Sequence, residues 1–380
     1  MSNGLKGIIL LGILVALASC GGNRSATVSD DGDTLRLKYA ERLVIVRHDG
    51  YSEVTLRNPW KEGKVLHRYL LVPHDAVPPH HNEQGATVVR VPLRRAVVFT
   101  TVHTSLLLTF GQKENIAGVA DLKYIKIPWI HEQVGQGRIV DCGDGLSPMV
   151  EKIIDANADA ILLSPFENNG GYGRLEDVDI PLIECAEYME TSPLGRAEWI
   201  RFYGMLFGCE QKADSLFAVV DSCYQALSAL AKDAPEAPTV LMDKQTGSVW
   251  YVPGGRSTIG QMLSDARGDY PFANDTRSGS LPLSFEAVFE QAGQSDVWLF
   301  RYDSDHPLTM RELQSEQRGY SQLRPVREGH VYGCNVRTSL FYEQSPFRPD
   351  YLLQDFIHIL HPGLPLPDTL RYYRRILTSS

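Results

Sequence analysis

Beyond position 94, short apolar runs alternate with segments in which apolar residues recur every three or four positions. This alternation is typical of βαβ units that build a largely parallel sheet. The first series predicts strands at 96–100, 116–120, 160–163 and 181–185 and helices at 104–110 and 148–156. The second predicts strands at 239–242, 297–300 and 331–333 and helices at 257–266, 284–291, 308–316 and 350–360. We therefore expect an α/β protein with two lobes, residues 94–192 and 235–380.

Between the two series the alternation stops, and helices are predicted at 193–207 and 211–232. In the second helix, Leu216, Val220 and Leu227 belong to one apolar face. At 1.5 Å per residue this helix would be about 33 Å long. Residues 193–234 are thus expected to join the lobes through one long helix, which would resist hinge bending and allow only small lobe movements.

The N-terminal region has a different pattern of apolar and polar residues from the two lobes. Residues 8–18 are apolar, follow Lys6 and are too few for a membrane span of about 20 residues, so residues 1–19 are predicted to be a signal peptide. The sequence LASC at 17–20 looks like a bacterial lipoprotein lipobox, which implies cleavage before Cys20 and lipidation of its thiol. The alternative is an ordinary signal peptide followed by a chance cysteine.

Two further segments precede the first lobe. Residues 20–34 are mostly small and polar, which favours a flexible tether. Residues 35–93 contain short strand-like runs separated by turn residues, which predicts a β-rich extension. The runs lie at 43–46, 54–56, 65–72 and 87–91.

Composition excludes several classes of protein. Of the 380 residues 43% are hydrophobic, and 17 tyrosines argue against overall disorder. The formal charge of -9 argues against nucleic-acid binding, which needs a basic surface. The five cysteines beyond Cys20 contain no CxxC spacing, so neither a disulfide scaffold nor a zinc ribbon is expected. Cys209 and Cys223 are the one candidate pair.

One unit is repeated inside the chain. Residues 150–154 open a helix that leads to the strand at 160–163, and residues 285–289 open a helix that leads to the strand at 297–300. Glu151 and Glu286 occupy the same place in the two first turns, away from the apolar faces. Those faces consist of Val150, Ile153 and Ile154 in one helix and Phe285, Val288 and Phe289 in the other. Each glutamate alone would stabilise its helix N-terminus, whereas the pair suits a two-point dock onto a basic partner.

These features together resemble the periplasmic substrate-binding proteins of ABC importers for iron complexes and cobalamin, in which one rigid helix joins two α/β lobes. The resemblance covers about residues 94–360. It is carried by VVFTTVH at 97–103, IAGV at 116–119, WYVPGG at 250–255, GHVY at 329–332 and the segments around Glu151 and Glu286. It implies that these two glutamates form salt bridges with arginines of the membrane permease.

The resemblance also implies a function. We expect a monomeric lipoprotein of the bacterial cell envelope that faces the periplasm, captures an iron complex (siderophore or haem) and delivers it to a permease with its ATPase. Cobalamin is the alternative ligand. No catalysis and no cofactor are expected.

Open α/β sheets bind ligands beyond the carboxyl ends of their strands, so the loops that leave the strands of both lobes should face one shared cleft. The candidate ligand contacts are taken from these loops. Aromatic side chains with a few arginines suit a large, flat or anionic chelate. The first lobe offers His103, Phe166, Glu167, Tyr172, Glu187 and Tyr188. The second lobe offers Trp250, Tyr251, Arg256, Arg301, Tyr302 and Arg337.

Two alternatives stay open at this point. The sequence contains no GxSxG, Walker A or HExxH motif, and no GxGxxG follows the first strand. A metal chelatase that holds a metal through His103 and Glu187 is nevertheless one alternative, and product formation from a metallated tetrapyrrole would distinguish it. A surface lipoprotein without a transport role is the other, and it predicts that charge reversal at Glu151 and Glu286 leaves nutrient uptake intact.

Overall fold

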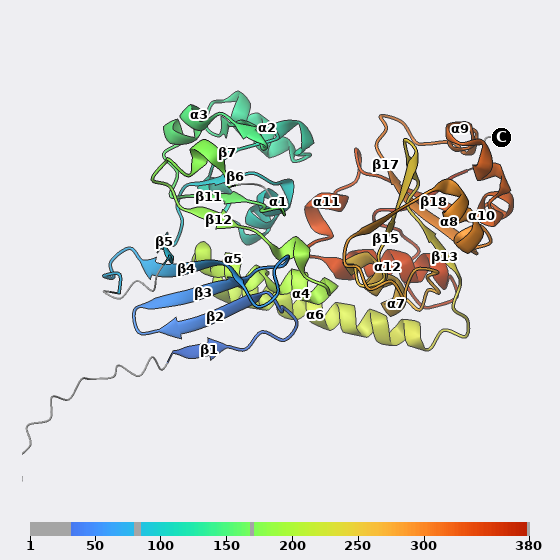
Figure 1. The fold of residues 1–380 in the computed structure, drawn as a ribbon, viewed down its shortest axis with the longest axis horizontal. Helices are drawn as coiled ribbons and strands as arrows, with labels where there is room; N and C mark the ends of the chain where they lie inside the picture. The colour runs from blue at the N-terminus through green and yellow to red at the C-terminus, as the bar shows by residue number, and fades with distance from the viewer. Residues whose placement is uncertain (1–31, 80–84, 168–170, 378–380) are drawn as a thin grey trace, which may run out of the picture.

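The computed structural model describes residues 32–79, 85–167 and 171–377 (Figure 1). Two α/β lobes stand side by side, and one long helix runs beneath both. The predicted signal peptide, Cys20 and positions 20–31 of the predicted tether lie outside the described residues. Within the described ranges no helix combines the length and apolar character needed to cross a bilayer.

The N-terminal lobe is built on a five-stranded sheet in the order β12-β11-β6-β7-β8, with all neighbouring strands parallel. Its strands are β6 (Ala96–Val98), β7 (Ile116–Val119), β8 (Val140–Asp141), β11 (Ala160–Leu163) and β12 (Leu182–Glu184). Its helices are α1 (Thr101–Phe110), α2 (Pro128–Gly135) and α3 (Val150–Asp155), and β9 (Gly143–Asp144) pairs with β10 (Ser147–Pro148). The four predicted strands are confirmed. Helix α2 was not predicted, because it buries only Ile130 and Gln133 and so lacks an apolar stripe.

The C-terminal lobe combines a parallel sheet with antiparallel additions. Its main sheet has the order β13-β17-β18-β19, in which only β19 is antiparallel to its neighbour. Its strands are β13 (Val240–Met242), β17 (Val297–Tyr302), β18 (Val331–Asn335) and β19 (Arg374–Arg375), with β14 (Gln245–Thr246), β15 (Val249–Pro253) and β16 (Ser280–Leu283) in a separate antiparallel sheet. Its helices are α7 (Thr258–Asp265), α8 (Phe285–Ala292), α9 (Met310–Glu316), α10 (Arg324–Glu328), α11 (Phe341–Gln344) and α12 (Pro349–Leu360).

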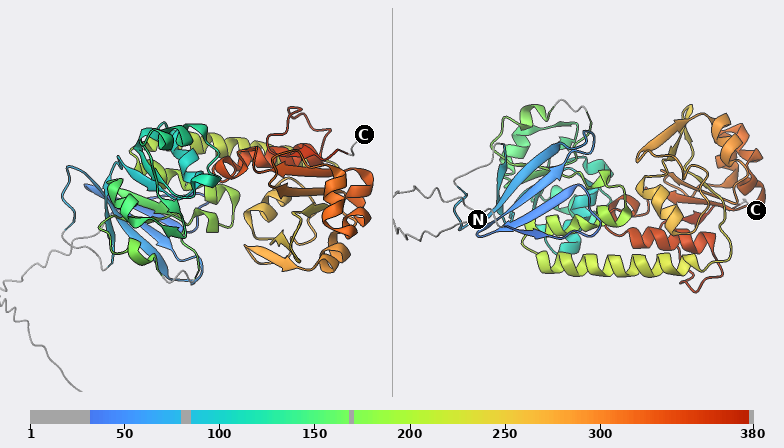
Figure 2. Two further views of the ribbon diagram at one scale, coloured as in Figure 1. Left: turned by 90° about the horizontal axis from the view of Figure 1, so that it is seen from above. Right: turned by 60° about the horizontal axis from the view of Figure 1, so that its bottom comes forward.

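The predicted connection consists of α4 (Pro193–Glu198), α5 (Ile200–Leu206) and the 23-residue α6 (Glu210–Lys232). Helix α6 runs along one side of both lobes (Figure 2). Ala213 near its start belongs to the hydrophobic core of the N-terminal lobe. Phe217, Val220 and Tyr224 belong to the core of the C-terminal lobe. One helix is therefore part of two cores, which confirms the prediction of a long helix between the lobes.

A second segment also links the lobes. Helix α11 contacts α1 of the N-terminal lobe. Thr101 at the start of α1 donates a hydrogen bond from its hydroxyl to Glu343 Oε1 of α11 over 3.1 Å. Phe347 lies among the core residues of the N-terminal lobe. The lobes are thus held together on two sides, which favours small lobe movements.

The N-terminal extension is a five-stranded sheet in the order β1-β2-β3-β4-β5, antiparallel except for the β4–β5 pair. Its strands are β1 (Asp33–Leu35), β2 (Leu43–His48), β3 (Tyr51–Arg57), β4 (Val65–Pro73) and β5 (Thr87–Val91). Strand β1 begins inside the predicted tether, because its three residues pair with β2. Ile45, Val54 and Val89 share one core with the N-terminal lobe, so the extension packs directly on that lobe.

Two buried carboxylates fasten the extension to the connecting helices. Glu198, fully buried in α4, accepts hydrogen bonds from the backbone N–H groups of Lys38, Tyr39 and Ala40 at 2.7–2.9 Å. Glu190, just before α4, accepts hydrogen bonds from the backbone N–H groups of Glu41 and Arg42 at 3.1 and 2.9 Å. It also accepts one from Trp199 Nε1. Because a buried charge is tolerated only when it is compensated, the residues between β1 and β2 are held in place by these glutamates.

The five cysteines within the described ranges do not form disulfides. Cys142, Cys185 and Cys334 are buried free thiols, and Cys209 and Cys223 are also free. The suggested pairing of Cys209 with Cys223 is therefore wrong.

The substitution Glu198→Ala should destabilise the protein by about 1–3 kcal/mol, because it leaves buried backbone N–H groups without an acceptor. Urea unfolding measures this change, and limited proteolysis should show cleavage between residues 35 and 43 before any other site. Glu236→Ala, at an exposed position, is the matched control. Equal unfolding midpoints for the two variants would contradict the role given to Glu198.

Candidate functional site

A cavity of about 670 Å³ lies at the carboxyl edge of the N-terminal sheet. Phe99 and Thr100 follow β6, Asp121 follows β7, Phe166 follows β11 and Tyr188 follows β12, and all five line the cavity. The strand-end rule predicted one cleft shared by both lobes, whereas every described residue that lines this cavity lies in the N-terminal lobe. The remaining lining residues are Gly145, Leu146, Ser147, Pro148, Val150, Leu163, Ser164, Pro165, Gly171, Tyr172, Gly173, Arg174 and Leu175.

The cavity brings together three of the predicted ligand contacts, Phe166, Tyr172 and Tyr188. Phe166 is 49% exposed. The Tyr172 hydroxyl donates to Glu184 Oε1 over 2.6 Å, and the Tyr188 hydroxyl donates to the carbonyl oxygen of Pro165. Burial raises the pKa of Tyr188 to about 12, so it stays protonated. Since both hydroxyls form hydrogen bonds within the protein, the two tyrosines contribute their rings to the cavity lining.

Among the residues that the structure describes, the cavity lining contains one acidic residue, Asp121, and one basic residue, Arg174, which the sequence reasoning missed. Arg174 lines the cavity, and its Nη2 lies 2.8 Å from Glu151 Oε1 on α3. It sits in a short 3-10 helix, Gly173–Leu175, directly after the glycine-rich loop that had drawn attention only to Tyr172. The position of Arg174 directly after that loop was the available signal.

His103 and Glu187 were expected at the ligand, but the structure buries both among protein groups. His103 is 1% exposed and Glu187 is 2% exposed, and neither lines the cavity. His103 Nε2 lies 3.0 Å from the Tyr203 hydroxyl and 3.5 Å from Glu187 Oε2. His103 Nδ1 contacts the hydroxyl of Thr100, the N-cap of α1. This closed network anchors the start of α1 rather than contacting a ligand.

Opposite effects act on the pKa values of this pair. Burial disfavours the charged form of His103, yet Cys185 and the Glu187 carboxylate raise its pKa to about 10. Burial likewise opposes ionisation of Glu187, but His103 and Arg196 hold its pKa below the ordinary value. The network is therefore a buried ion pair at neutral pH.

The structure also corrects the role expected for Trp250. It was expected at the ligand, but its side chain is fully buried and donates from Nε1 to the carbonyl oxygen of Met242 over 3.0 Å. Its ring packs against Trp298, Phe285 and Tyr320. It is a core residue because it lies on the inner face of β15.

Exposure differs among the other candidates. Tyr251, the next residue of β15, is 48% exposed. The side chains of Arg256, just before α7, and Glu167 are also exposed. None of these three lines the N-terminal cavity.

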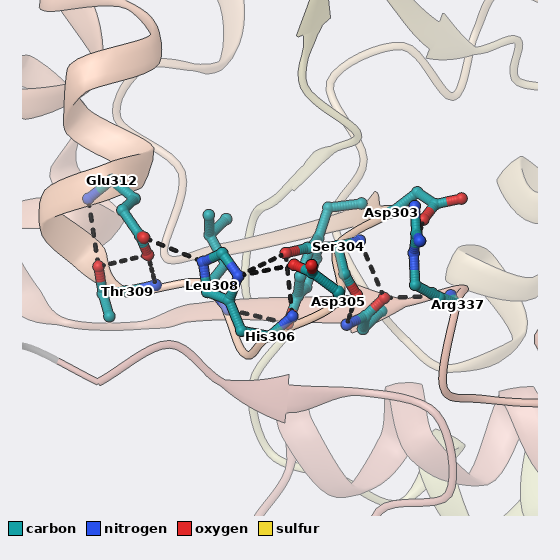
Figure 3. Close-up of polar contacts among 10 residues, drawn as sticks. Asp303, Ser304, Asp305, His306, Leu308, Thr309, Glu312 and Arg337 are labelled. Carbon is teal, nitrogen blue, oxygen red and sulfur yellow. Dashed lines mark hydrogen bonds and ion pairs between the residues drawn. The ribbon is translucent and has the colours of Figure 1, made fainter.

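The carboxyl edge of the C-terminal sheet carries two arginine–aspartate pairs. Arg301 on β17 forms a bidentate pair with Asp243, at 3.0 and 2.7 Å. Arg337, which follows β18, places its Nε 2.5 Å from Asp303 Oδ1 (Figure 3). The two arginines are thus placed near strand ends, as predicted, but each already has a carboxylate partner.

The loop after β17 holds a polar cluster around His306 (Figure 3). His306 lies 2.9 Å from Asp305 and 3.0 Å from Glu312, and these carboxylates raise its pKa. Glu312 also accepts hydrogen bonds from the side chain and backbone of Thr309, which lowers its pKa to about 2. Because Thr309 and Glu312 form a capping box, the cluster fixes the start of α9. Among the described residues no group of histidine, cysteine or acidic side chains is arranged to hold a metal ion.

A smaller cavity of about 250 Å³ lies between the lobes. Val102 and Arg196 line it from the N-terminal side, and Arg301, Phe341 and Tyr342 line it from the C-terminal side. Of the predicted ligand residues only Arg301 reaches it.

A sequence profile of the periplasmic binding protein family matches residues 96–338. The chain belongs to this family. An uncharacterized lipoprotein of Methanocaldococcus jannaschii is 24% identical over 359 residues, which cover 88% of this chain and 84% of the relative. The family resemblance predicted from the sequence is confirmed, and with it a substrate-binding role.

Solved structures share the fold of this periplasmic binding protein. A periplasmic heme binding protein from Pseudomonas aeruginosa superposes with a TM-score of 0.58 at 14% identity, covering 76% of this chain and 99% of that one. A periplasmic vitamin B12 binding protein from Vibrio cholerae gives a TM-score of 0.53 at 13% identity, covering 71% and 97%. The two-lobed α/β architecture with a long connecting helix is therefore confirmed.

The two glutamates singled out in this periplasmic binding protein occupy the first turns of α3 and α8. Both are exposed. Figure 1 places α3 on the side of the N-terminal lobe away from α6, and α8 in the outer half of the C-terminal lobe. The apolar face assigned to α3 needs one correction, because Ile154 is 53% exposed whereas Val150 and Ile153 are buried.

The stabilising effect of the His103–Glu187 pair should depend on pH in a defined direction. Because the folded pKa of His103 is about 10 and its ordinary value is 6.5, its contribution is full below pH 6.5 and is lost as the pH rises through 10. Because the pKa of Glu187 is lowered, its contribution is lost as the pH falls below 4.5. The difference in unfolding free energy between wild type and His103→Gln should therefore shrink from pH 6 to pH 10. A difference that stays constant or grows across this range would contradict the buried ion pair.

Proposed function

We propose that this protein is a lipid-anchored binding protein that captures an iron complex, a siderophore or haem, and delivers it to an ABC permease. The cavity at the carboxyl edge of the N-terminal sheet is the observation that carries this proposal. Its volume of about 670 Å³ falls within the range usual for ligand sites, about 300–1,000 Å³. Cobalamin is the alternative ligand of the same type.

The lining suits a large chelate with apolar surface. Phe99, Phe166, Tyr172 and Tyr188 supply aromatic area, and Arg174 supplies a positive charge. Aromatic rings gain free energy by stacking on flat ligands, and a guanidinium group pairs with carboxylates at fixed geometry. In this proposal the protein binds and releases its cargo without making or breaking a covalent bond.

Delivery requires recognition by a membrane partner. Glu151 and Glu286 are exposed carboxylates in equivalent first turns of two lobes whose separation is fixed by α6. Two charges held at a constant distance match two basic pockets on one partner, which gives orientation as well as attraction. The family profile and the lipoprotein relative support an envelope location, with Cys20 as the proposed lipidation site.

Binding is tested by titrating the purified protein with ferric protoporphyrin IX, a ferric hydroxamate siderophore, ferric citrate and cyanocobalamin, followed by absorbance or tryptophan fluorescence. Phe166→Ala should weaken binding of the chelate about tenfold, because the substitution removes the apolar contact between the ring and the ligand. Tyr124→Ala is the matched control, since Tyr124 is 61% exposed and does not line the cavity. If wild type binds none of the four chelates, the proposal is refuted.

Docking is tested by charge reversal. Glu151→Lys with Glu286→Lys should abolish uptake of the bound chelate by cells while leaving at least one chelate bound in solution. Asp155→Lys with Glu290→Lys is the control, because these exposed acids lie on the same two helices outside the first turn. Uptake that survives the first double substitution contradicts docking through these glutamates.

A further inference from the structure

Arg174 connects the cargo cavity with the carboxylate proposed for docking. It lines the cavity, and its guanidinium Nη2 lies 2.8 Å from Glu151 Oε1. Among the described residues that line the cavity, it is the one that carries a positive charge. The Arg174 side chain therefore contacts both the cargo cavity and the proposed docking carboxylate, which the proposed function treats as separate sites.

The backbone on both sides of Arg174 is firmly anchored. Leu175 is buried, with 4% of its surface exposed. The Tyr172 hydroxyl is held by Glu184, and the Tyr172 backbone N–H donates to Glu176 Oε1 over 2.6 Å. Gly173 has a φ of +56°, a conformation that glycine adopts readily. Any change of partner by Arg174 is therefore a movement of its side chain about a fixed point.

The pair with Glu151 is easily exchanged. The Arg174 side chain is 72% exposed and the Glu151 side chain 70%. Ion pairs so exposed are weak and screened by salt, so another anion can compete for the guanidinium group. An anion inside the cavity would have the advantage of a less hydrated surrounding.

We propose that Arg174 changes partner when cargo binds: it pairs with Glu151 in the empty protein and with an anionic group, a carboxylate of the metal chelate, in the loaded protein. Loading then leaves Glu151 free for a basic group of the transporter. This inference rests on the proposed function and adds to it a cargo class, anionic chelates, and a means by which the transporter distinguishes loaded from empty protein. By linkage, cargo and transporter each strengthen binding of the other by the same factor. A factor of about two- to fivefold is expected for an exposed pair.

The test compares wild type, Arg174→Gln, Glu151→Gln and the double variant. The probes are ferric protoporphyrin IX, which carries two carboxylates, and its dimethyl ester, in which these are neutral. Arg174→Gln should weaken binding of the acid form about two- to fivefold. Glu151→Gln should strengthen it by a similar factor, because Glu151 no longer competes with the chelate for Arg174. The double variant should match Arg174→Gln, and the ester should bind all four proteins equally.

Two further measurements separate this exchange from a simple loss of charge. Glu328→Gln and Arg324→Gln change an exposed pair in the C-terminal lobe and should leave both probes unaffected. In the empty protein a backbone hydrogen bond and Arg174 hold the pKa of Glu151 below its ordinary value. That pKa, measured by carboxyl carbon NMR, should rise when the acid probe saturates the protein.

The outcomes are distinct. Unchanged or weaker binding of the acid probe by Glu151→Gln, or an unmoved pKa of Glu151 in the loaded protein, overturns the partner exchange while leaving the proposed function intact. Wild type that binds only an uncharged chelate, such as cyanocobalamin, also overturns the exchange alone. Wild type that binds none of the chelates overturns both.

Discussion

The burial of one helix in two hydrophobic cores is the constraint on which the rest of this structure depends. Ala213 of α6 packs in the N-terminal lobe, and Phe217, Val220 and Tyr224 pack in the C-terminal lobe. Bending or shifting α6 would remove apolar surface from one core or the other. The distance between the lobes is thereby fixed, and so is the spacing of anything that the two lobes present to a common partner.

Buried charge reinforces that constraint at the points where segments meet. Glu198 and Glu190 bind backbone N–H groups of the extension, and Glu187 pairs with His103 beneath the start of α1. Each of these carboxylates loses its water on folding and is compensated by several protein donors. As a result, the extension, the connecting helices and the first βα loop form one rigid body on which the cavity is mounted.

The cavity and helix α3 meet at a single loop. The hydrogen bond of Tyr172 to Glu184 and the burial of Leu175 hold this loop in place. Arg174, which lies between these two residues, remains at the surface beside Glu151. A rigid body with one exposed, weakly held guanidinium group can respond to cargo without a large lobe movement. Under the proposed function, this arrangement lets a transporter distinguish loaded from empty protein although the connecting helix is stiff.

The sequence by itself missed α2 and predicted a cleft shared by both lobes, whereas the cavity lies in one lobe. It did determine the main strands and helices of each lobe and the long helix between the lobes. These follow from local periodicity, since the spacing of apolar residues shows which side of an element is buried. It could not decide which polar or aromatic side chains reach the cavity. Trp250 and His103 stood at suitable positions, but Met242 and Tyr203, the latter 100 residues away from His103, engage them inside the protein. Likewise, Arg174 gained its importance only when α3 was placed beside its loop. Tertiary structure decided these cases because the groups that compete with a ligand for each side chain come from distant parts of the chain.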